Sequence, residues 1–305
     1  MTDVSVVIVS YRNRPVLGRC LAALAGDTGR TASREVIVVD QASDDGSVAW
    51  LKAEHPDVRV VELSENVGFG AGNNRGVAVA EGRWLLLLNS DAFVLHGAID
   101  ELVRFGDARP EAGIVGPRLL WPDGRLQRSC RRFPTVFRLA TEYLYLRKLA
   151  SRSRILNGFY YADFAHDEAW RVDWVTGACL LVRRDLYERL GGFDEAFFLY
   201  SEEVDLLYRA RRIGAETWFD PAAEVEHEWG GTAGRSSALT LEEQARSHVR
   251  YFDKHISRAT AKRARRVLLT GLRLRARRSA THREAARWLA ARPVEALLAE
   301  TRPPA

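Results

Sequence analysis

Cysteine is scarce in this sequence, with only Cys20, Cys130 and Cys179 among 305 residues. Their spacing matches neither a thiolate metal site nor a redox pair, and an odd, sparse set argues against a disulfide-built scaffold and favours a reducing compartment. Cys20 and Cys179 stand among apolar neighbours. Because free cysteine is one of the most frequently buried residue types, we expect both of these side chains in the core.

Long apolar runs are also missing. The longest, Trp84–Leu88, is far shorter than the roughly 20 residues that a helix needs to span a bilayer. The first residues, Met1–Val4, show no basic segment followed by an apolar core, which argues against a signal peptide. We therefore expect a cytoplasmic protein, with the inner face of the plasma membrane as the place where it would meet lipid.

Acidic residues are nearly absent from residues 258–292, where Glu284 is the only acid, although the net charge of the whole chain is only +5. The basic residues of this stretch are Arg258, Lys262, Arg263, Arg265, Arg266, Arg273, Arg275, Arg277, Arg278, Arg283, Arg287 and Arg292. Such a run must face solvent, phosphate or an anionic surface. Because it lacks interleaved aromatic residues for base stacking, we expect no nucleic-acid partner.

The same stretch contains apolar residues at helical spacing. On a helix, Val267, Leu268 and Leu272 form one stripe with arginines beside or opposite it. That composition predicts a helix lying on an anionic membrane surface through residues 258–292. The alternative is a helix packed on the rest of the protein with a solvated basic face.

What the sequence does contain is an alternation of short buried strands and helical patterns. The length, with 47% hydrophobic and 28% charged residues, allows one large α/β domain with an appendage. The order strand, helix, strand implies right-handed crossovers and a mainly parallel central sheet flanked by helices. The predicted strands are Val4–Val9, Val36–Val39, Val58–Glu62 and Trp84–Leu88, and the predicted helices are 15–26, 46–54 and 70–80.

Polar segments follow each of these four strands. They are Ser10–Asn13, Asp40–Ser47, Glu65–Gly76 and Asn89–Asp91. Because ligands gather at the carboxyl ends of parallel strands, this arrangement predicts a functional site at one edge of the sheet.

The turn Asn89–Asp91 places a carboxylate at the end of the leucine-rich strand. Mg²⁺ and Mn²⁺ favour one or two carboxylates together with phosphate oxygens and water. His227 ends a short predicted strand and could complete such a site. The alternatives are a turn that only caps the next helix and a histidine that is structural.

The segment Asn66–Gly76 holds four glycines and three asparagines. Glycine lets a backbone approach a ligand closely, and a helix that begins near Gly70 would direct its N-terminus at a phosphate. The pattern is not the dinucleotide-binding fingerprint, and the alternative is a flexible loop.

Three acids, Glu202, Glu203 and Asp205, cluster at the start of a predicted helix after the aromatic run Phe197–Tyr200. The helix dipole stabilises negative charge there, so the acids could serve only as caps. The other interpretation is that one of them is a general base that deprotonates an acceptor hydroxyl, with the aromatic residues as a wall for a sugar.

Taken together, the motifs resemble the family-two inverting glycosyltransferases, specifically bacterial rhamnosyltransferase-like members, over about residues 4–255. The matching segments are Val6–Tyr11, Val38–Asp40 with Ser43 and Asp45–Ser47, Asn66–Gly70 with Gly72–Asn74, Leu88–Asp91, Gly177–Arg184 and Gly191–Glu195. The resemblance implies a GT-A fold over residues 1–255, with a nucleotide-sugar-binding half (1–117) and an acceptor-binding, catalytic half (118–255). Residues 256–305 would form a basic helical extension.

The resemblance also implies roles for individual residues. Asp91 and His227 would bind the metal, and Glu203 would be the base, with Glu202 and Asp205 as alternatives. The acceptor would contact Trp174, Gly177, Phe197, Phe198 and Tyr200. The donor would contact Ser10, Tyr11, Asn13, Asp40, Gln41, Asn66, Gly68, Gly70, Asn73, Asn74, Asn89 and Ser90.

Two residues depart from the family pattern. Asn89 stands where a first Asp is common, and Glu203 stands where the base is often Asp. The expected cofactor remains Mg²⁺ or Mn²⁺.

The implied reaction moves a sugar, by resemblance rhamnose from a thymidine diphosphate donor, to a glycan or lipid-linked acceptor in cell-surface polysaccharide synthesis. Other functions left open are a nucleotidyltransferase that makes an activated sugar, a glycoside hydrolase, and a basic nucleic-acid-binding protein.

Overall fold

Four parallel strands form one half of the central sheet in the computed structural model, which describes residues 2–27, 31–149, 153–161, 164–228 and 237–300. They are β1 (Val4–Ser10), β2 (Arg34–Gln41), β3 (Val58–Leu63) and β4 (Trp84–Asn89), in the order β3-β2-β1-β4. The connecting helices are α1 (Arg14–Gly26), α2 (Ser47–Glu54) and α3 (Phe69–Val77). The four predicted strands are thus confirmed, and their carboxyl ends meet at one edge.

The second half of the sheet mixes strand directions. Strand β11 (Cys179–Arg183) runs antiparallel between β4 and β6 (Ala112–Leu120), and β12 (Glu216–His227) runs parallel to β6. Strands β5 (Ala92–Val94), β9 (Trp170–Val172) and β7 (Leu126–Gln127) add antiparallel pairs. The sequence patterns of Glu216–Phe219 and Val225–His227 each predict a short strand. The structure joins them in the single strand β12, with an irregular register between Asp220 and Glu224.

A separate two-stranded sheet pairs β8 (Cys130–Arg131) with β10 (Trp174–Val175), so that Arg131 lies opposite Trp174. The apolar pattern of Val172–Val175 predicts one short strand. In the structure Val172 ends β9 and Trp174 begins β10, so these neighbouring residues belong to different sheets.

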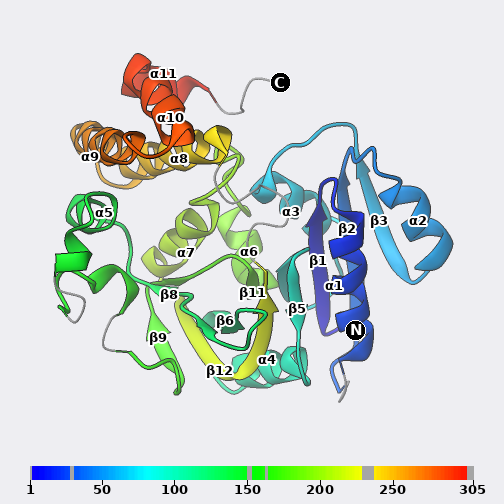
Figure 1. Cartoon of the computed structure of the whole chain (residues 1–305). Coiled ribbons are helices and arrows are strands. Elements are labelled where there is room, and N and C mark those ends of the chain that lie inside the picture. Colours follow the sequence, from blue (N-terminus) through cyan, green and yellow to red (C-terminus); the bar gives the residue numbers. More distant parts are fainter. Residues whose placement is uncertain (1, 28–30, 150–152, 162–163, 229–236, 301–305) are drawn as a thin grey trace.

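Both faces of the sheet are covered. Along β1, Val7 and Val9 belong to one apolar cluster and Val6 and Ile8 to the other, as expected for a strand buried on both sides. Helix α1 and helix α4 (Ala98–Asp107) pack on one face. On the other lie α3, α6 (Arg184–Leu190), α7 (Glu202–Arg212) and α8 (Ala238–His255) (Figure 1).

The last three helices, α9 (Arg258–Ala276), α10 (Ala280–Ala291) and α11 (Val294–Ala299), form a layer over α8, and α9 also contacts α5 (Val136–Tyr143) (Figure 1). Leu268 and Leu272 are buried in the same cluster as Val249 of α8, and Val267 packs against that cluster. The apolar stripe predicted to face a membrane therefore faces protein instead, because α5, α8 and α10 cover it. No helix within the described ranges is both long enough and apolar enough to cross a bilayer.

Candidate active site

Asp91 and His227 face each other at the carboxyl edge of the sheet. The His227 Nε2 atom lies 3.4 Å from Asp91 Oδ1, and both side chains are buried. The backbone N–H of Glu228 donates to the Asp91 carbonyl, which fastens the end of β12 to the Asn89–Asp91 turn. The two residues predicted to bind a metal thus come together, although they lie far apart in the sequence.

Gln127 fixes the tautomer of His227. The Gln127 Nε2 amide donates to the His227 carbonyl oxygen, so Gln127 Oε1 must accept from Nδ1–H at 2.7 Å. The Nε2 lone pair of the neutral imidazole then points at the Asp91 carboxylate. Two acceptors in this position need a proton or a cation between them. The pair therefore fits a divalent cation that takes its remaining ligands from phosphate and water. No cluster of three or more potential protein ligands occurs among the described residues.

A buried chain of hydrogen bonds supports this turn from β1. The Ser10 hydroxyl donates to Asn13 Oδ1, and the Asn13 amide donates to the Ser90 hydroxyl at 2.6 Å. All three side chains are buried. Ser10, Asn13 and Ser90, predicted as donor contacts, thus form a scaffold that holds the Asn89–Asp91 turn.

The end of β2 offers an unsatisfied acceptor. One Asp40 oxygen accepts from the Ser43 N–H, whereas Oδ2 is buried and has no hydrogen-bond partner in the part of the chain that the structure describes. Gln41 Oε1 accepts from the Val67 N–H and so joins β2 to the glycine-rich loop. Tyr11, which follows the β1 residue paired with Asp40, is half-buried. A buried carboxylate oxygen without a donor suits a ribose hydroxyl or a base N–H.

The glycine-rich loop is held by the segment before α7. Gly68 has φ +89°, and a side chain there would collide with the Phe198 carbonyl oxygen. That oxygen accepts from the Phe69 N–H, and Asn66 Oδ1 accepts from the Gly68 N–H. Gly70 packs against the Cβ of Glu202. The N-terminus of α3 therefore lies beside the acidic start of α7.

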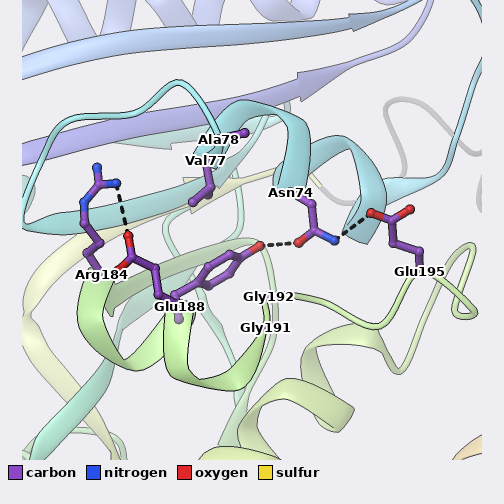
Figure 2. A pocket seen from close by; sticks show the side chains of 9 residues that line it. Asn74, Val77, Ala78, Arg184, Glu188, Gly191, Gly192 and Glu195 are labelled. Atoms are coloured by element: carbon purple, nitrogen blue, oxygen red, sulfur yellow. Dashed lines mark hydrogen bonds and ion pairs between the residues drawn. The ribbon is translucent and has the colours of Figure 1, made fainter.

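Asn73 and Asn74 point in different directions from the loop. The Asn73 amide donates to the Phe69 carbonyl within α3, and its Oδ1 is buried without a partner in the described segments. Asn74 donates to Glu195 and accepts from the Tyr187 hydroxyl. Figure 2 shows Asn74 facing Glu195 and the Gly191–Gly192 turn, at an open pocket of about 420 Å³. Asn74 thus fastens α3 to α6.

Glu202 and Glu203 form a coupled acidic pair. Burial and the neighbouring Glu203 charge raise the pKa of Glu202 well above its ordinary value, and burial also raises the pKa of Glu203. Each carboxyl has one buried oxygen that lacks a partner among the described residues. The preceding residues Tyr200 and Ser201 both adopt left-handed backbone conformations, which is the kind of strain that collects at functional sites.

Asp205 is bound in an ion-pair cluster. Its carboxylate accepts from Arg209 at 2.8 Å, contacts Lys254 at 2.6 Å and lies 2.7 Å from His255 Nε2. The side chain is fully buried. Asp205 therefore fastens α7 to α8, and the geometry favours Glu203 and Glu202 over Asp205 as the base.

The predicted acceptor residues divide into surface and core. Gly177 packs against the Glu203 side chain. Tyr200 lies near both glutamates. Burial, followed by the charges of Glu202 and Glu203, raises the pKa of Tyr200 to about 12. Phe197 is only 1% exposed and Trp174 only 3%. These two rings therefore belong to the core that supports the site. Phe198 contributes its backbone carbonyl oxygen, which accepts from the Phe69 N–H.

Residues 2–253 match the family described as Glycosyltransferase like family 2. This match spans far more than half of the chain. The chain belongs to glycosyltransferase family 2.

Two named enzymes illustrate the relationship. The glycosyltransferase is 32% identical over 268 residues to N-acetylglucosaminyl-diphospho-decaprenol L-rhamnosyltransferase of Mycobacterium tuberculosis, which covers 84% of this chain and 86% of that protein. It is 26% identical over 170 residues to the rhamnosyltransferase WbbL of Escherichia coli, covering 52% of this chain and 60% of the relative.

The solved structures support the fold. The mannosyltransferase PcManGT of Pyrobaculum calidifontis, in complex with GDP-Man and Mn²⁺, superimposes with a TM-score of 0.58 at 19% identity and covers 99% of this chain and 86% of that one. The predicted GT-A fold is thereby confirmed for the glycosyltransferase.

Two residues that adjoin the candidate site were not predicted from the sequence. Gln127 orients His227, and Arg131 lies near Glu203, where its positive charge opposes the rise in the pKa of Glu203. Between them, Ser129 accepts a backbone hydrogen bond from Thr176, next to Gly177. Their alternation at 127, 129 and 131 is the period of an extended segment. This alternation in the sequence could have indicated that residues 127–131 form one edge of the site.

Proposed function

We propose that the glycosyltransferase transfers rhamnose from a nucleoside-diphosphate donor to a hydroxyl of a lipid-linked sugar, with inversion at the anomeric carbon. The observation that carries the proposal is the placement of the Glu202–Glu203 pair opposite the N-terminus of α3. The Asp91–His227 pair lies at the same sheet edge. A base and a diphosphate site are thus held on one rigid framework.

The donor is expected at the carboxyl ends of β1, β2 and β4. Asp40 Oδ2, buried and without a partner among the described residues, would accept from the nucleoside. Asp91 and His227 would hold Mg²⁺ or Mn²⁺ against the diphosphate, as the crystallisation of the related mannosyltransferase fold with GDP-Man and Mn²⁺ supports. When bound, that ion supplies charge neutralisation for the departing nucleoside diphosphate.

Glu203 is the proposed general base. It accepts the proton of the acceptor hydroxyl as the oxygen attacks the anomeric carbon, while the bond from that carbon to the diphosphate breaks on the opposite face. A raised pKa suits this role, because a base works best when its pKa lies near the operating pH. No covalent glycosyl-enzyme is required, so the anomeric configuration inverts.

The acceptor is proposed to be a sugar joined through diphosphate to a polyprenol lipid. The support is the likeness to the mycobacterial rhamnosyltransferase, whose acceptor is named as N-acetylglucosaminyl-diphospho-decaprenol. Such an acceptor belongs to the synthesis of cell-surface polysaccharide and places the reaction at the inner face of the plasma membrane.

Helix α9 offers a surface for that membrane. Arg263, Arg266 and Arg273 of α9, together with its C-cap residue Arg277, are exposed, and none of the four is paired with an acid within the described ranges. Their spacing places them on one face of the helix, opposite the buried Leu268 and Leu272. We infer that this arginine face, rather than the apolar stripe, meets the anionic lipid.

Product analysis tests the proposed reaction. The enzyme is incubated with dTDP-rhamnose and other nucleotide sugars, a lipid-diphosphate-linked N-acetylglucosamine, and Mg²⁺ or Mn²⁺. We expect one nucleoside diphosphate released for each glycoside formed, inverted configuration by NMR, and loss of turnover with chelator. Retained configuration, or release of free sugar without glycoside, would contradict the proposal.

A further inference from the structure

Arg131 occupies a cage of aromatic rings beside the proposed base. Its guanidinium carbon lies 5.1 Å from the ring centre of Trp174, 5.2 Å from that of Tyr160 and 5.7 Å from that of Phe159. Three rings around one cation hold it in place, and the Arg131 side chain is half-buried between them. The pairing of β8 with β10 fixes this geometry, because Arg131 lies directly opposite Trp174.

The charge of Arg131 is not neutralised by the protein. Its Nε atom is buried and has no hydrogen-bond partner among the described residues, and no carboxylate in those segments forms an ion pair with it. The guanidinium acts on Glu203 and His248 only through space. A half-buried guanidinium whose buried Nε–H has no acceptor is costly unless an anion completes it, and its planar fork matches phosphate oxygens.

Arg131 lies at the opposite end of the site from the Asp91–His227 pair. Gln127, which holds His227, and Arg131 are four residues apart on an extended segment, a span of roughly 13 Å. Between the two ends, Ser129 is joined to Thr176, and Gly177 packs on Glu203. The base therefore lies between the donor's diphosphate site and Arg131.

We propose that Arg131 binds the diphosphate that links the acceptor sugar to its lipid, and so selects acceptors that carry this group. The proposal rests on the proposed function. In such an acceptor the reactive hydroxyl and the diphosphate lie on opposite sides of one sugar ring. Glu203 and Arg131 are close enough to interact electrostatically, so one ring can present its hydroxyl to the first and its diphosphate to the second.

A binding experiment tests this role without relying on transfer. Full-length protein is titrated by calorimetry with a short-chain prenyl diphosphate, in chelator and without donor, so that the metal site contributes nothing. We expect Arg131→Gln to weaken binding by roughly 10–100-fold, the usual effect of losing charge-assisted hydrogen bonds, and Arg131→Lys to restore part of it. Arg132→Gln is the matched control, because Arg132 lies over Tyr161 outside the cage. Equal binding by wild type and Arg131→Gln overturns the proposal.

A second experiment separates acceptor selection from an effect on Glu203. Transfer is compared for a lipid-diphosphate-linked N-acetylglucosamine and for an alkyl glycoside of the same sugar. Arg131→Gln should raise the acceptor KM by roughly 10–100-fold for the diphosphate acceptor alone, with donor KM unchanged. An equal loss with both acceptors, together with a shifted pH profile, would show that Arg131 only tunes Glu203 and would overturn the proposal. Absence of transfer by wild type to either acceptor would instead contradict the proposed function, and the binding result would still decide the role of Arg131.

Discussion

At the scale of single residues, the proposed chemistry depends on carboxyl groups whose pKa the fold raises. Glu202 is 6% exposed and lies beside Glu203, and the pKa of both groups is raised, first by burial. An acid whose pKa is raised on folding binds protons more tightly in the native state. Its contribution to stability is therefore present at low pH and is lost as the pH rises above the ordinary value of 4.5.

Glu202→Gln should leave the acid limb of the kcat–pH profile in place. Burial, followed by the charge of Glu203, raises the pKa of Glu202, so Glu203 ionises first, while Glu202 is still protonated and neutral. The unfolding temperature of the variant should nevertheless exceed that of wild type by a margin that grows from about pH 4.5 toward neutral pH, because wild type must then hold a buried charge at Glu202. Glu188→Gln, at an exposed carboxylate, is the control and should change neither curve. An acid limb that moves to lower pH in Glu202→Gln would show that Glu202 is already ionised when Glu203 titrates, and would contradict this order.

Gln127→Leu should weaken metal binding by roughly 10–100-fold, the usual effect of removing the partner that orients a ligating histidine. Gln127 Oε1 accepts from the Nδ1–H of His227 and so favours the tautomer that presents Nε2 to Asp91. The measurement is Mn²⁺ titration of turnover at saturating donor. Gln127→Glu keeps an acceptor for Nδ1–H and should retain most of the affinity. An unchanged Mn²⁺ requirement in the Leu variant would remove His227 from the metal site.

The sequence located part of this site because strand ends and helix starts are local features. Asp91 follows a strand that can be recognised by its leucines, and Glu203 begins a helix with acids in its first turn. Gln127 and Arg131 lie on strands of only two residues, whose partners are set by long connections. Asn74 and Phe197 show a further limit, since local pattern does not tell which way a side chain points.

At the scale of elements, α9 shows what an amphipathic pattern does and does not determine. The spacing of Leu268 and Leu272 correctly indicated a buried face, but any apolar surface can cover such a face. Here Gly271 packs against Tyr143 of α5, and Arg275 donates to the Tyr143 carbonyl oxygen. The polar face of α9, with its arginines, is exposed and is therefore the face that another molecule could contact.

Changing the α9 arginines Arg263, Arg266, Arg273 and Arg277 to Gln should abolish sedimentation with anionic vesicles at low salt. Each cation near such a surface contributes about 1 kcal/mol, so the four together contribute about 4 kcal/mol. The control has the same net charge and changes four exposed arginines outside α9, namely Arg104, Arg125, Arg171 and Arg189. Equal losses in both variants, or vesicle binding that salt does not weaken, would contradict a role for the α9 face.

At the scale of the whole molecule, the two halves of the sheet differ in how well the sequence predicts them. The parallel half β1 to β4 alternates with helices, so that chain order and spatial order are linked by short right-handed crossovers. The other half interleaves β11, β6, β12 and β5, whose neighbours come from distant parts of the chain. Pairing of that kind depends on tertiary packing, and it is what brings His227 to Asp91.

The C-terminal helices extend the same core. Ala261, Ala264, Leu289 and Leu297 belong to the cluster that contains α7 and α8. The Arg246 side chain, 2% exposed, pairs with Glu243 and Glu300 and so ties α8 to the chain end. We propose that residues 256–300 are an integral layer of the catalytic unit, which would carry the α9 arginine face at a fixed position relative to the site.

Transfer by Glu203→Gln in a single turnover, with donor, metal and lipid-diphosphate acceptor all saturating, tests the central claim most directly. Donor binding should match wild type, because in the proposed reaction Glu203 acts on the acceptor hydroxyl and not on the donor. The rate of glycoside formation should fall by roughly 10²–10⁴-fold, the usual effect of removing a general base. A Glu203→Gln variant that forms glycoside at close to the wild-type rate would contradict the account, because the base would then have to lie elsewhere.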